Sequence, residues 1–152
     1  MSGFDNKMDL LGSQAREAAA KLAFSTIKQR SQAISKTSKL ILNNSDIILS
    51  ANEIDMSYGR DRDLGDAMLD RLFLDTPRVK SIANSLQDIA ELPDPLGKVL
   101  SQWERPSGLK IRRVTTPIGV IGVIYESRPN VTADAGALCL MAGNATILRG
   151  GS

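Results

Sequence analysis

The chain has 152 residues, of which 42% are hydrophobic and 24% are charged, and its formal net charge is +2. This composition is typical of a soluble globular protein and excludes the disordered and fibrous classes. The small net charge gives no strong attraction to nucleic acid or to an anionic membrane, so we expect neither as a partner.

The residue types that are absent exclude several kinds of chemistry. The chain has no histidine and a single cysteine, Cys139. This excludes Ser-His-Asp catalysis, histidine metal ligands and a zinc cluster, so we expect no metal site. One cysteine cannot form an internal disulfide, the first residues lack the pattern of a signal peptide, and the apolar run at residues 118–125 is too short to span a bilayer. We therefore expect a cytoplasmic protein.

Helical spacing dominates the first ninety or so residues. Apolar side chains recur three or four positions apart in three stretches. The stripes are Met8, Leu11, Ala15, Ala18, Ala19 and Leu22; Ile34, Leu40 and Ile41; and Val79, Ile82, Ala83, Leu86, Ile89 and Ala90. Thr26 and Gln29 form a capping box for the second stripe, and Asp75 with Pro77 caps the third. We interpret every stripe as helix-packing core and not as a membrane or peptide-binding face.

Strand patterns begin after a proline-rich break at residues 92–97. Residues 99–104 and 109–115 are predicted strands, joined around residues 105–108 in a hairpin. The basic residues of this segment are predicted to lie on a solvated strand edge rather than to form a phosphate-binding track.

The last part of the chain predicts a strand, a helix and a second strand. Residues 118–125 are a continuous β-branched run, which is typical of a strand buried on both faces of a parallel sheet. Residues 131–141 suit a helix that stops at Gly143 and Asn144, and residues 145–148 suit another buried strand. From about residue 117 onward, the pattern therefore predicts one β-α-β unit of a doubly wound domain.

The loop between the first strand and the helix carries the candidate functional residues. Glu126, Ser127, Arg128 and Asn130 put a carboxylate, a hydroxyl, a guanidinium and an amide where ligands bind in open parallel sheets. Such a loop could bind a small anionic substrate, with the arginine on a carboxylate or a phosphate. It could equally be a polar turn followed by an asparagine helix cap, and spacing alone does not choose between the two.

Three motifs resemble a known enzyme family. Residues 117–124 (PIGVIGVI) resemble the strand that opens the cofactor domain of aldehyde dehydrogenases, and residues 143–149 (GNATILR) resemble the strand one helix later. Most of these enzymes carry Pro-Trp-Asn-Phe-Pro between the two strands, whereas residues 125–131 read YESRPNV. That departure is similar to the signature of the gamma-glutamyl phosphate reductase family, and residues 137–140 and 148–151 fit the same family.

The resemblance implies an α/β fold with three parts. Residues 1–96 would be a helical N-terminal region and residues 97–116 a β-hairpin arm. Residues 117–152 would begin a doubly wound, Rossmann-like cofactor domain of aldehyde dehydrogenase type, which is incomplete. The complete enzyme is expected to be a homo-oligomer, with the arm pairing with another subunit as the corresponding arm does in aldehyde dehydrogenases.

The resemblance also implies a reaction of proline biosynthesis. A cysteine thiolate attacks the acyl phosphate of L-glutamyl 5-phosphate and expels phosphate, and NADPH then reduces the thioester to L-glutamate 5-semialdehyde. Asn130 matches the asparagine whose amide holds the oxyanion, and Arg149 matches the basic residue that reaches the cofactor's ribose or its phosphate, which favours NADP. Glu126, Ser127 and Arg128 stand where substrate contacts are expected.

Cys139 does not fit the family's nucleophile, because it lies in an apolar helix and the family's cysteine lies well downstream. We therefore expect a core cysteine and an N-terminal portion, cut off before the catalytic cysteine, that is inactive alone. Two alternatives stay open. One is the corresponding part of bifunctional pyrroline-5-carboxylate synthase, although the start at Met1 argues against an upstream kinase domain. The other is a stand-alone helical binding module without turnover.

Overall fold

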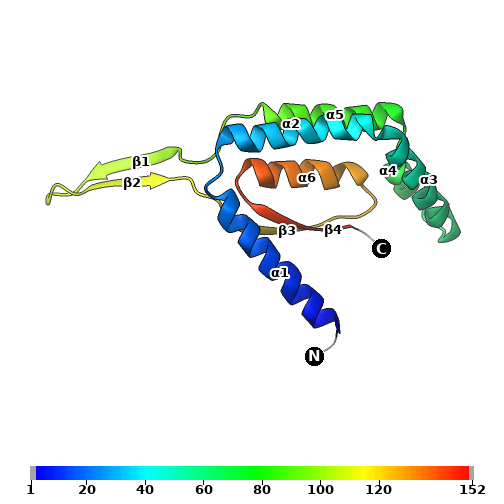
Figure 1. Cartoon of the computed structure of the whole chain (residues 1–152), viewed down its shortest axis with the longest axis horizontal. Helices are drawn as coiled ribbons and strands as arrows, with labels where there is room; N and C mark the ends of the chain where they lie inside the picture. Colours follow the sequence, from blue (N-terminus) through cyan, green and yellow to red (C-terminus); the bar gives the residue numbers. More distant parts are fainter. Residues whose placement is uncertain (1–2, 151–152) are drawn as a thin grey trace.

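The computed structural model describes residues 3–150, which form six helices and four strands (Figure 1). The helices are α1 (Gly3–Leu22), α2 (Ile27–Asn43), α3 (Ser45–Asp61), α4 (Asp66–Leu72), α5 (Thr76–Ala90) and α6 (Pro129–Met141), and the strands are β1 (Val99–Glu104), β2 (Lys110–Val114), β3 (Val120–Ile124) and β4 (Ala145–Arg149). This arrangement confirms the α/β prediction of a helical region followed by a hairpin and one β-α-β unit.

Two of the helices begin at the caps that the sequence predicts. At the start of α2, the backbone N–H of Gln29 donates to Oγ1 of Thr26 at 3.3 Å, and the Gln29 side chain accepts from the Thr26 backbone at 2.8 Å. At the start of α5, Oδ1 of Asp75 accepts from the backbone of Arg78 at 2.8 Å. Each contact satisfies a backbone group that the first helical turn leaves without a partner.

The core lies where α2, α5 and α6 pack together, with α2 and α5 side by side above α6 (Figure 1). Its buried residues come from all three helices: Ile34, Leu86, Ile89, Ala90, Ala137 and Met141. The stripe predicted on α5 is confirmed, because five of its members are buried and Ile82 is half-buried. The stripes on α1 and α2 are partly wrong.

Leu40 and Met8 are the largest errors, with 59% and 47% of their surfaces exposed, and Leu11 and Ala18 of the stripe on α1 are exposed as well. Helix α2 buries Arg30, Ile34 and Ser38, which are four residues apart on one face. Leu40 is six positions beyond Ile34, and that spacing turns it away from this face of a helix with about 3.6 residues per turn. The buried face of α2 is completed by the polar residues Arg30 and Ser38 and not by Leu40.

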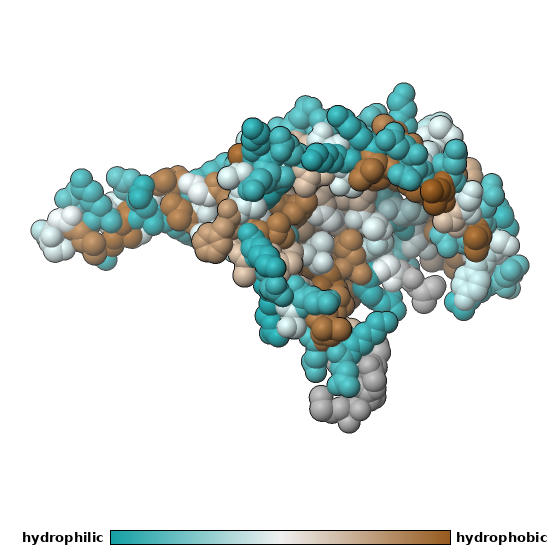
Figure 2. All heavy atoms as spheres, in the orientation of Figure 1, coloured by the Kyte–Doolittle hydropathy of each residue, from teal (hydrophilic) through white to brown (hydrophobic). Residues whose placement is uncertain are grey.

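The strands form two separate pairs. The antiparallel pair β1 and β2 projects from the body as an arm, and nearly all of its side chains are exposed. Figure 2 shows apolar side chains at the surface of this arm among polar ones. Strands β3 and β4 are parallel and in register from the pair Val120 and Ala145 to the pair Ile124 and Arg149.

The apolar run at residues 118–125, whose pattern is typical of a strand buried on both faces, is not covered on both faces within the described residues. Helix α6 lies over one face of the β3 and β4 pair (Figure 1). On this face the Leu148 side chain approaches Gly136. Ile118 and Ile124 are each 83% exposed. In residues 3–150 no second layer of helices covers them, so an apolar strand surface faces solvent.

The end of α6 is tied to the start of β3. Gly143 adopts a left-handed φ of 71°, and the N–H groups of Gly143 and Asn144 donate to the carbonyls of Leu140 and Cys139 at 2.9 Å each. This is the Schellman arrangement that stops a helix, as the sequence predicts. The buried Asn144 side chain then accepts from the backbone of Ile118 at 2.7 Å, which fixes where β3 begins.

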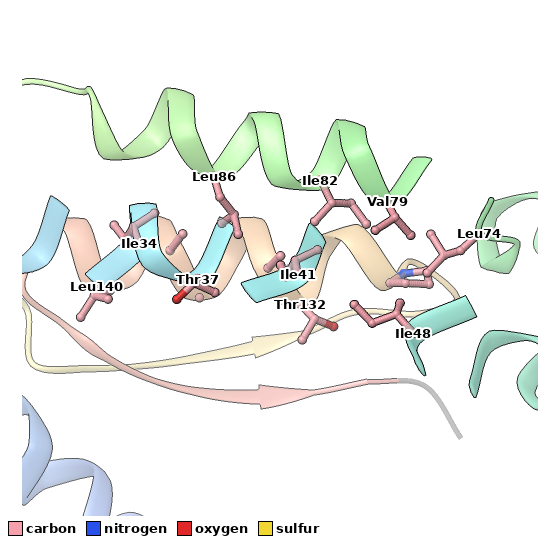
Figure 3. A pocket seen from close by; sticks show the side chains of 14 residues that line it. Ile34, Thr37, Ile41, Ile48, Leu74, Val79, Ile82, Leu86, Thr132 and Leu140 are labelled. Atoms are coloured by element: carbon pink, nitrogen blue, oxygen red, sulfur yellow. The ribbon is translucent and has the colours of Figure 1, made fainter. Parts of the chain in front are cut away.

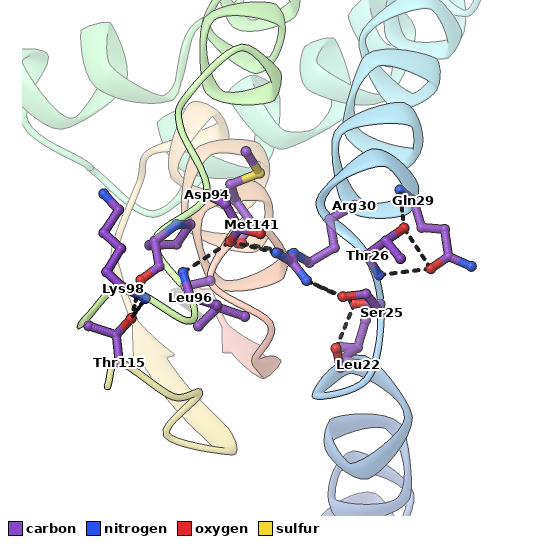
Figure 4. A network of polar contacts seen from close by, with 12 residues as sticks. Leu22, Ser25, Thr26, Gln29, Arg30, Asp94, Leu96, Lys98, Thr115 and Met141 are labelled. Carbon is purple, nitrogen blue, oxygen red and sulfur yellow. Dashed lines mark hydrogen bonds and ion pairs between the residues drawn. The ribbon is translucent and has the colours of Figure 1, made fainter. Parts of the chain in front are cut away.

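A second polar junction centres on Arg30, whose side chain is only 2% exposed (Figure 4). Its Nε donates to the carbonyl of Met141 at 3.1 Å, its Nη1 donates to the carbonyl of Ser25, and its Nη2 pairs with Oδ1 of Asp94 at 2.7 Å. One guanidinium therefore links the start of α2, the end of α6 and the loop before the arm.

None of the helices in residues 3–150 has both the length and the apolar character needed to cross a membrane.

Candidate active site

The candidate site lies at the carboxyl edge of the β3 and β4 pair. Because the strands are parallel, Ile124 and Arg149 stand opposite each other at the same edge. The backbone N–H of Tyr125 donates to the carbonyl of Arg149 at 3.1 Å and extends the pairing by one residue. The loop after β3 and the residue at the end of β4 are thereby held side by side, at the edge where ligands bind in open parallel sheets.

Tyr125 anchors the loop to α6. Its hydroxyl lies 2.5 Å from Oγ1 of Thr132 in the first turns of that helix. The next residue but one, Ser127, adopts a left-handed φ of 47°, a conformation that costs free energy for a residue with a Cβ atom. Backbone strain of this kind is often found at binding sites.

The start of α6 differs from the asparagine cap that was one interpretation of the sequence. Arg128 occupies the N-cap position and makes no side-chain cap hydrogen bond, and Pro129 follows in the first turn. Asn130 lies inside the helix, and its Nδ2 donates to Oδ2 of Asp134 at 3.2 Å. The helix-cap interpretation of Asn130 is therefore wrong.

The charged groups of the site face solvent. Glu126, Arg128, Asn130 and Arg149 are exposed, and Ser127 is half-buried. No side-chain hydrogen bond or ion pair joins Glu126 or Arg128 to another residue in the described part of the chain, and Nη1 of Arg149 donates to the carbonyl of Gly150 at 2.8 Å. Four of the five candidates thus gather on one loop and helical turn, with Arg149 on the neighbouring strand.

Two hollows in the described residues are separate from these polar groups. A cleft of about 410 Å³ lies between α2, α5 and α6, where Ile34, Ile41 and Leu86 point into it (Figure 3). Another hollow, of about 440 Å³, lies between α1, α6 and β4. Neither is lined by any of the five candidates, so the candidate site is an open surface rather than an enclosed pocket.

Sequence reasoning missed two residues that shape this surface, Thr132 and Asp134. The Thr132 and Tyr125 hydroxyls share a hydrogen bond, and the Asp134 carboxylate accepts one from the Asn130 amide. A carboxylate four positions after the candidate asparagine on a predicted helix is a signal that could have identified Asp134, because residues at that spacing are neighbours on a helix surface.

Cys139 is buried, with 8% of its surface exposed. Its place in the core is therefore confirmed. Among residues 3–150, no group of three or more histidine, cysteine or acidic side chains is placed to hold a metal ion.

The fold of the chain resembles that of the matching part of an aldehyde dehydrogenase. A NAD-dependent benzaldehyde dehydrogenase from Corynebacterium glutamicum superposes with a TM-score of 0.63 at 20% identity, over 90% of this chain and 28% of that structure. At this identity the likeness shows the fold alone. No family model matches the chain.

Sequence and structure comparisons at higher identity agree on one kind of enzyme. The gamma-glutamyl phosphate reductase of Thermotoga maritima superposes with a TM-score of 0.88 at 40% identity, over 91% of this chain and 34% of that structure. The reductase of Saccharomyces cerevisiae gives 0.86 at 37%, over 92% of this chain and 36% of that structure. The Paramagnetospirillum magneticum reductase is 52% identical over 148 residues, which are 97% of this chain and 35% of that relative.

The chain thus matches the N-terminal portion of gamma-glutamyl phosphate reductases, which confirms the resemblance seen in the sequence. It spans 35% of the length of the curated relative from Paramagnetospirillum magneticum. The reductase of Allorhizobium ampelinum, 51% identical over 150 residues, is covered to the same 35%.

Proposed function

We propose that the chain supplies the N-terminal portion of an NADPH-dependent reductase that converts L-glutamyl 5-phosphate to L-glutamate 5-semialdehyde and phosphate. The observation that carries this proposal is the polar loop at residues 125–130. The loop stands at the carboxyl edge of a parallel strand pair, in a chain that is 52% identical over 148 residues to a gamma-glutamyl phosphate reductase.

The loop offers a complementary group for each charged part of this substrate. L-glutamyl 5-phosphate carries a carboxylate, an ammonium and an acyl phosphate. Arg128 is exposed and unpaired with any described residue, and a guanidinium binds carboxylate or phosphate through two parallel hydrogen bonds. Glu126 is suited to the ammonium, and the Ser127 hydroxyl to either oxygen-bearing end. We assign these three residues to substrate binding.

Asn130 is the group that stabilises the reacting centre in this proposal. Attack of a thiolate on the acyl carbon places negative charge on the carbonyl oxygen, and a fixed amide N–H that points at this oxygen lowers the barrier. Asn130 follows directly after the substrate loop on the first turn of a rigid helix. It therefore meets the requirement that an oxyanion donor be held in place before the reaction.

Arg149 is the residue that fits the phosphate-bearing cofactor. Its side chain is exposed at the end of β4, and only Nη1 is engaged, by the Gly150 carbonyl. The remaining guanidinium N–H groups suit the ribose phosphate of NADP, which supplies a hydride when bound.

The nucleophile of this reaction is assigned to the part of the relatives that the chain does not span. Cys139 is 8% exposed and lies in the core, so a substrate on the open surface cannot reach its thiol. The 152-residue chain alone should not turn over the substrate. NADPH-dependent semialdehyde formation by the chain alone, lost in Cys139→Ala, would contradict this assignment.

The proposal is tested in a full-length chimera in which this chain replaces the matching part of the Paramagnetospirillum magneticum reductase. Asn130→Ala should lower kcat by about a hundred- to a thousandfold, the usual effect of removing an oxyanion donor, and leave the KM for NADPH unchanged. The thermal midpoint should move little, because Asn130 is not a helix cap. A normal kcat would remove Asn130 from the site.

A further inference from the structure

We infer that Asp134 is a positioning residue, whose carboxylate holds the Asn130 amide with its nitrogen, and not its oxygen, toward the reacting carbonyl. The inference rests on the proposed function, in which Asn130 is the oxyanion donor. It concerns a residue that neither the loop motif nor the strand motifs include.

The contact between the two side chains determines that the nitrogen, and not the oxygen, of the Asn130 amide faces Asp134. Asn130 and Asp134 are four residues apart on α6, and Nδ2 of Asn130 lies 3.2 Å from Oδ2 of Asp134. An ionised carboxylate only accepts hydrogen bonds, so the amide must present its NH₂ group to it. The opposite flip would place the amide oxygen against the carboxylate oxygen, which is repulsive.

One of the two amide N–H bonds is left for the substrate. Asp134 accepts a single N–H from Asn130, and the amide is planar, so the second N–H points away from Asp134 in the same plane. Asn130 is exposed, and no other hydrogen bond of its Nδ2 is formed within the described residues, so this N–H is free to bind a substrate. Without Asp134, the amide can rotate by about half a turn and present its oxygen to the developing negative charge.

Asp134 carries a cost that a purely structural role would not explain. Its other oxygen, Oδ1, is buried and has no hydrogen-bond partner among the described residues. A buried acceptor without a partner destabilises the folded protein, and an alanine would be free of this penalty while keeping the helix intact. A carboxylate at this position therefore indicates a requirement beyond folding, which the contact to Asn130 supplies.

The chain contains a comparable control pair at the end of another helix, where Gln87 lies on α5 and Glu91 is its C-cap residue. On α5, Nε2 of Gln87 donates to Oε1 of Glu91 at 3.1 Å, again from an amide to a carboxylate four residues later. Glu91 is exposed and stands outside the candidate site. Glu91→Ala thus removes the same kind of contact where no effect on catalysis is expected.

The test is a double-mutant cycle in the full-length chimera. Asp134→Ala should lower kcat by up to about a hundredfold, as small misplacements of reacting groups do, with the KM for NADPH unchanged. In the Asn130→Ala background the same change should cost less than about twofold, because residues that act as a unit are not additive. Glu91→Ala should leave kcat unchanged. The inference is overturned if the losses in kcat of the two single variants multiply in the double variant. It is also overturned if Asp134→Ala has an unchanged kcat.

A second variant and a direct measurement of the amide distinguish failure of the positioning role from failure of the proposed function. Asp134→Leu has nearly the size of the aspartate side chain and no acceptor atom, so it replaces Asp134→Ala in the cycle if the alanine variant does not fold. The Asn130 amide can also be observed directly by NMR of the ¹⁵N-labelled protein. Its side-chain signals are identified as those that disappear in Asn130→Ala. These signals should shift in the Asp134 variants and not in Glu91→Ala. A chimera without turnover would reject the proposed function, whereas unshifted amide signals would reject the positioning role in any case.

Discussion

Arg30 and Asp94 form an ion pair between helix α2 and the loop that precedes the arm, with Nη2 and Oδ1 2.7 Å apart. The Arg30 side chain is 2% exposed and the Asp94 side chain 33%. Sixty-four residues separate the two partners, and the guanidinium also bonds to the Met141 carbonyl of α6. This junction thus fixes the helical core to the β-α-β unit that carries the candidate site.

The asymmetry of this pair predicts an asymmetric response to mutation. Asp94→Ala leaves a buried guanidinium without its counter-charge, and we expect it to lower the free energy of unfolding by about 3 kcal/mol. Arg30→Met leaves a carboxylate that water can reach, and we expect a smaller loss of roughly 1–2 kcal/mol. Apparent urea midpoints of the two variants, measured in the full-length chimera, give the ranking.

An exposed ion pair provides the control for this measurement. Nη2 of Arg78 lies 2.8 Å from Oδ1 of Asp70, with side chains 41% and 71% exposed. Asp70→Ala should change the free energy of unfolding by less than about 1 kcal/mol. If Asp94→Ala and Asp70→Ala proved equally mild, the Arg30 junction would not be the link that the geometry suggests.

The strained residue of the candidate loop allows stability and function to be separated. Ser127 and Asp63 both adopt a left-handed φ, of 47° and 54°. A glycine at either position relieves about 1–2 kcal/mol of backbone strain in the folded state. It also costs roughly 0.5–1 kcal/mol, because glycine gives the unfolded chain more conformational entropy. Both substitutions should therefore leave the free energy of unfolding equal or slightly raised. Only Ser127→Gly should lower kcat/KM for glutamyl phosphate in the chimera. Equal activity of both variants would remove the Ser127 hydroxyl from substrate binding.

The sequence predicted the parts of the fold that local rules determine. The capping box at Thr26, the cap at Asp75 and the Schellman end of α6 all follow from a few neighbouring residues. What local patterns could not show is which face a helix buries when polar side chains fill it. Arg30 and Ser38 are buried because partners distant in sequence satisfy them, so the apolar spacing that included Leu40 misplaced the buried face of α2.

The candidate site was predictable to a similar degree. The loop motif placed Glu126, Ser127, Arg128 and Asn130 together, because contiguous residues between a strand and a helix share one edge. The motif did not reveal the left-handed backbone at Ser127. It also did not reveal that the Asn130 amide turns back to Asp134 instead of capping the helix, since that choice depends on where the helix begins.

Arg149 should determine the preference for the phosphorylated cofactor. Arg149→Ala in the chimera removes charge-assisted hydrogen bonds to the ribose phosphate, and we expect NADPH to bind roughly 10- to 100-fold more weakly. NADH lacks that phosphate and should change by less than about threefold. Arg128→Ala, which is assigned to the substrate, should leave both cofactor affinities unchanged. Equal weakening of NADPH and NADH would make Arg149 a general ribose contact or a structural residue.

The chain on its own is expected to be only marginally stable and to associate. Ile118 and Ile124 are each 83% exposed beside a parallel pair that has only two strands in residues 3–150. Open strand edges and apolar faces of this kind pair with other copies. We therefore expect helix-rich circular dichroism, a broad thermal transition and soluble oligomers or aggregates by size-exclusion chromatography with light scattering.

A charged substitution on the open strand face tests which surface drives this association. Ile124→Lys places a charge next to the uncovered face of β3 and should shift the chain toward monomer, because burying an unpaired ammonium between copies is costly. Ile54→Lys is the matched control, since Ile54 is 72% exposed but lies on α3, away from the strands. Loss of association in Ile54→Lys alone would assign the contact to the helical region. A sharp, cooperative melt from a clean monomer of the unsubstituted chain would show that its residues form a self-sufficient domain. That result would favour a binding module without turnover, because the strand surface would then need no further covering.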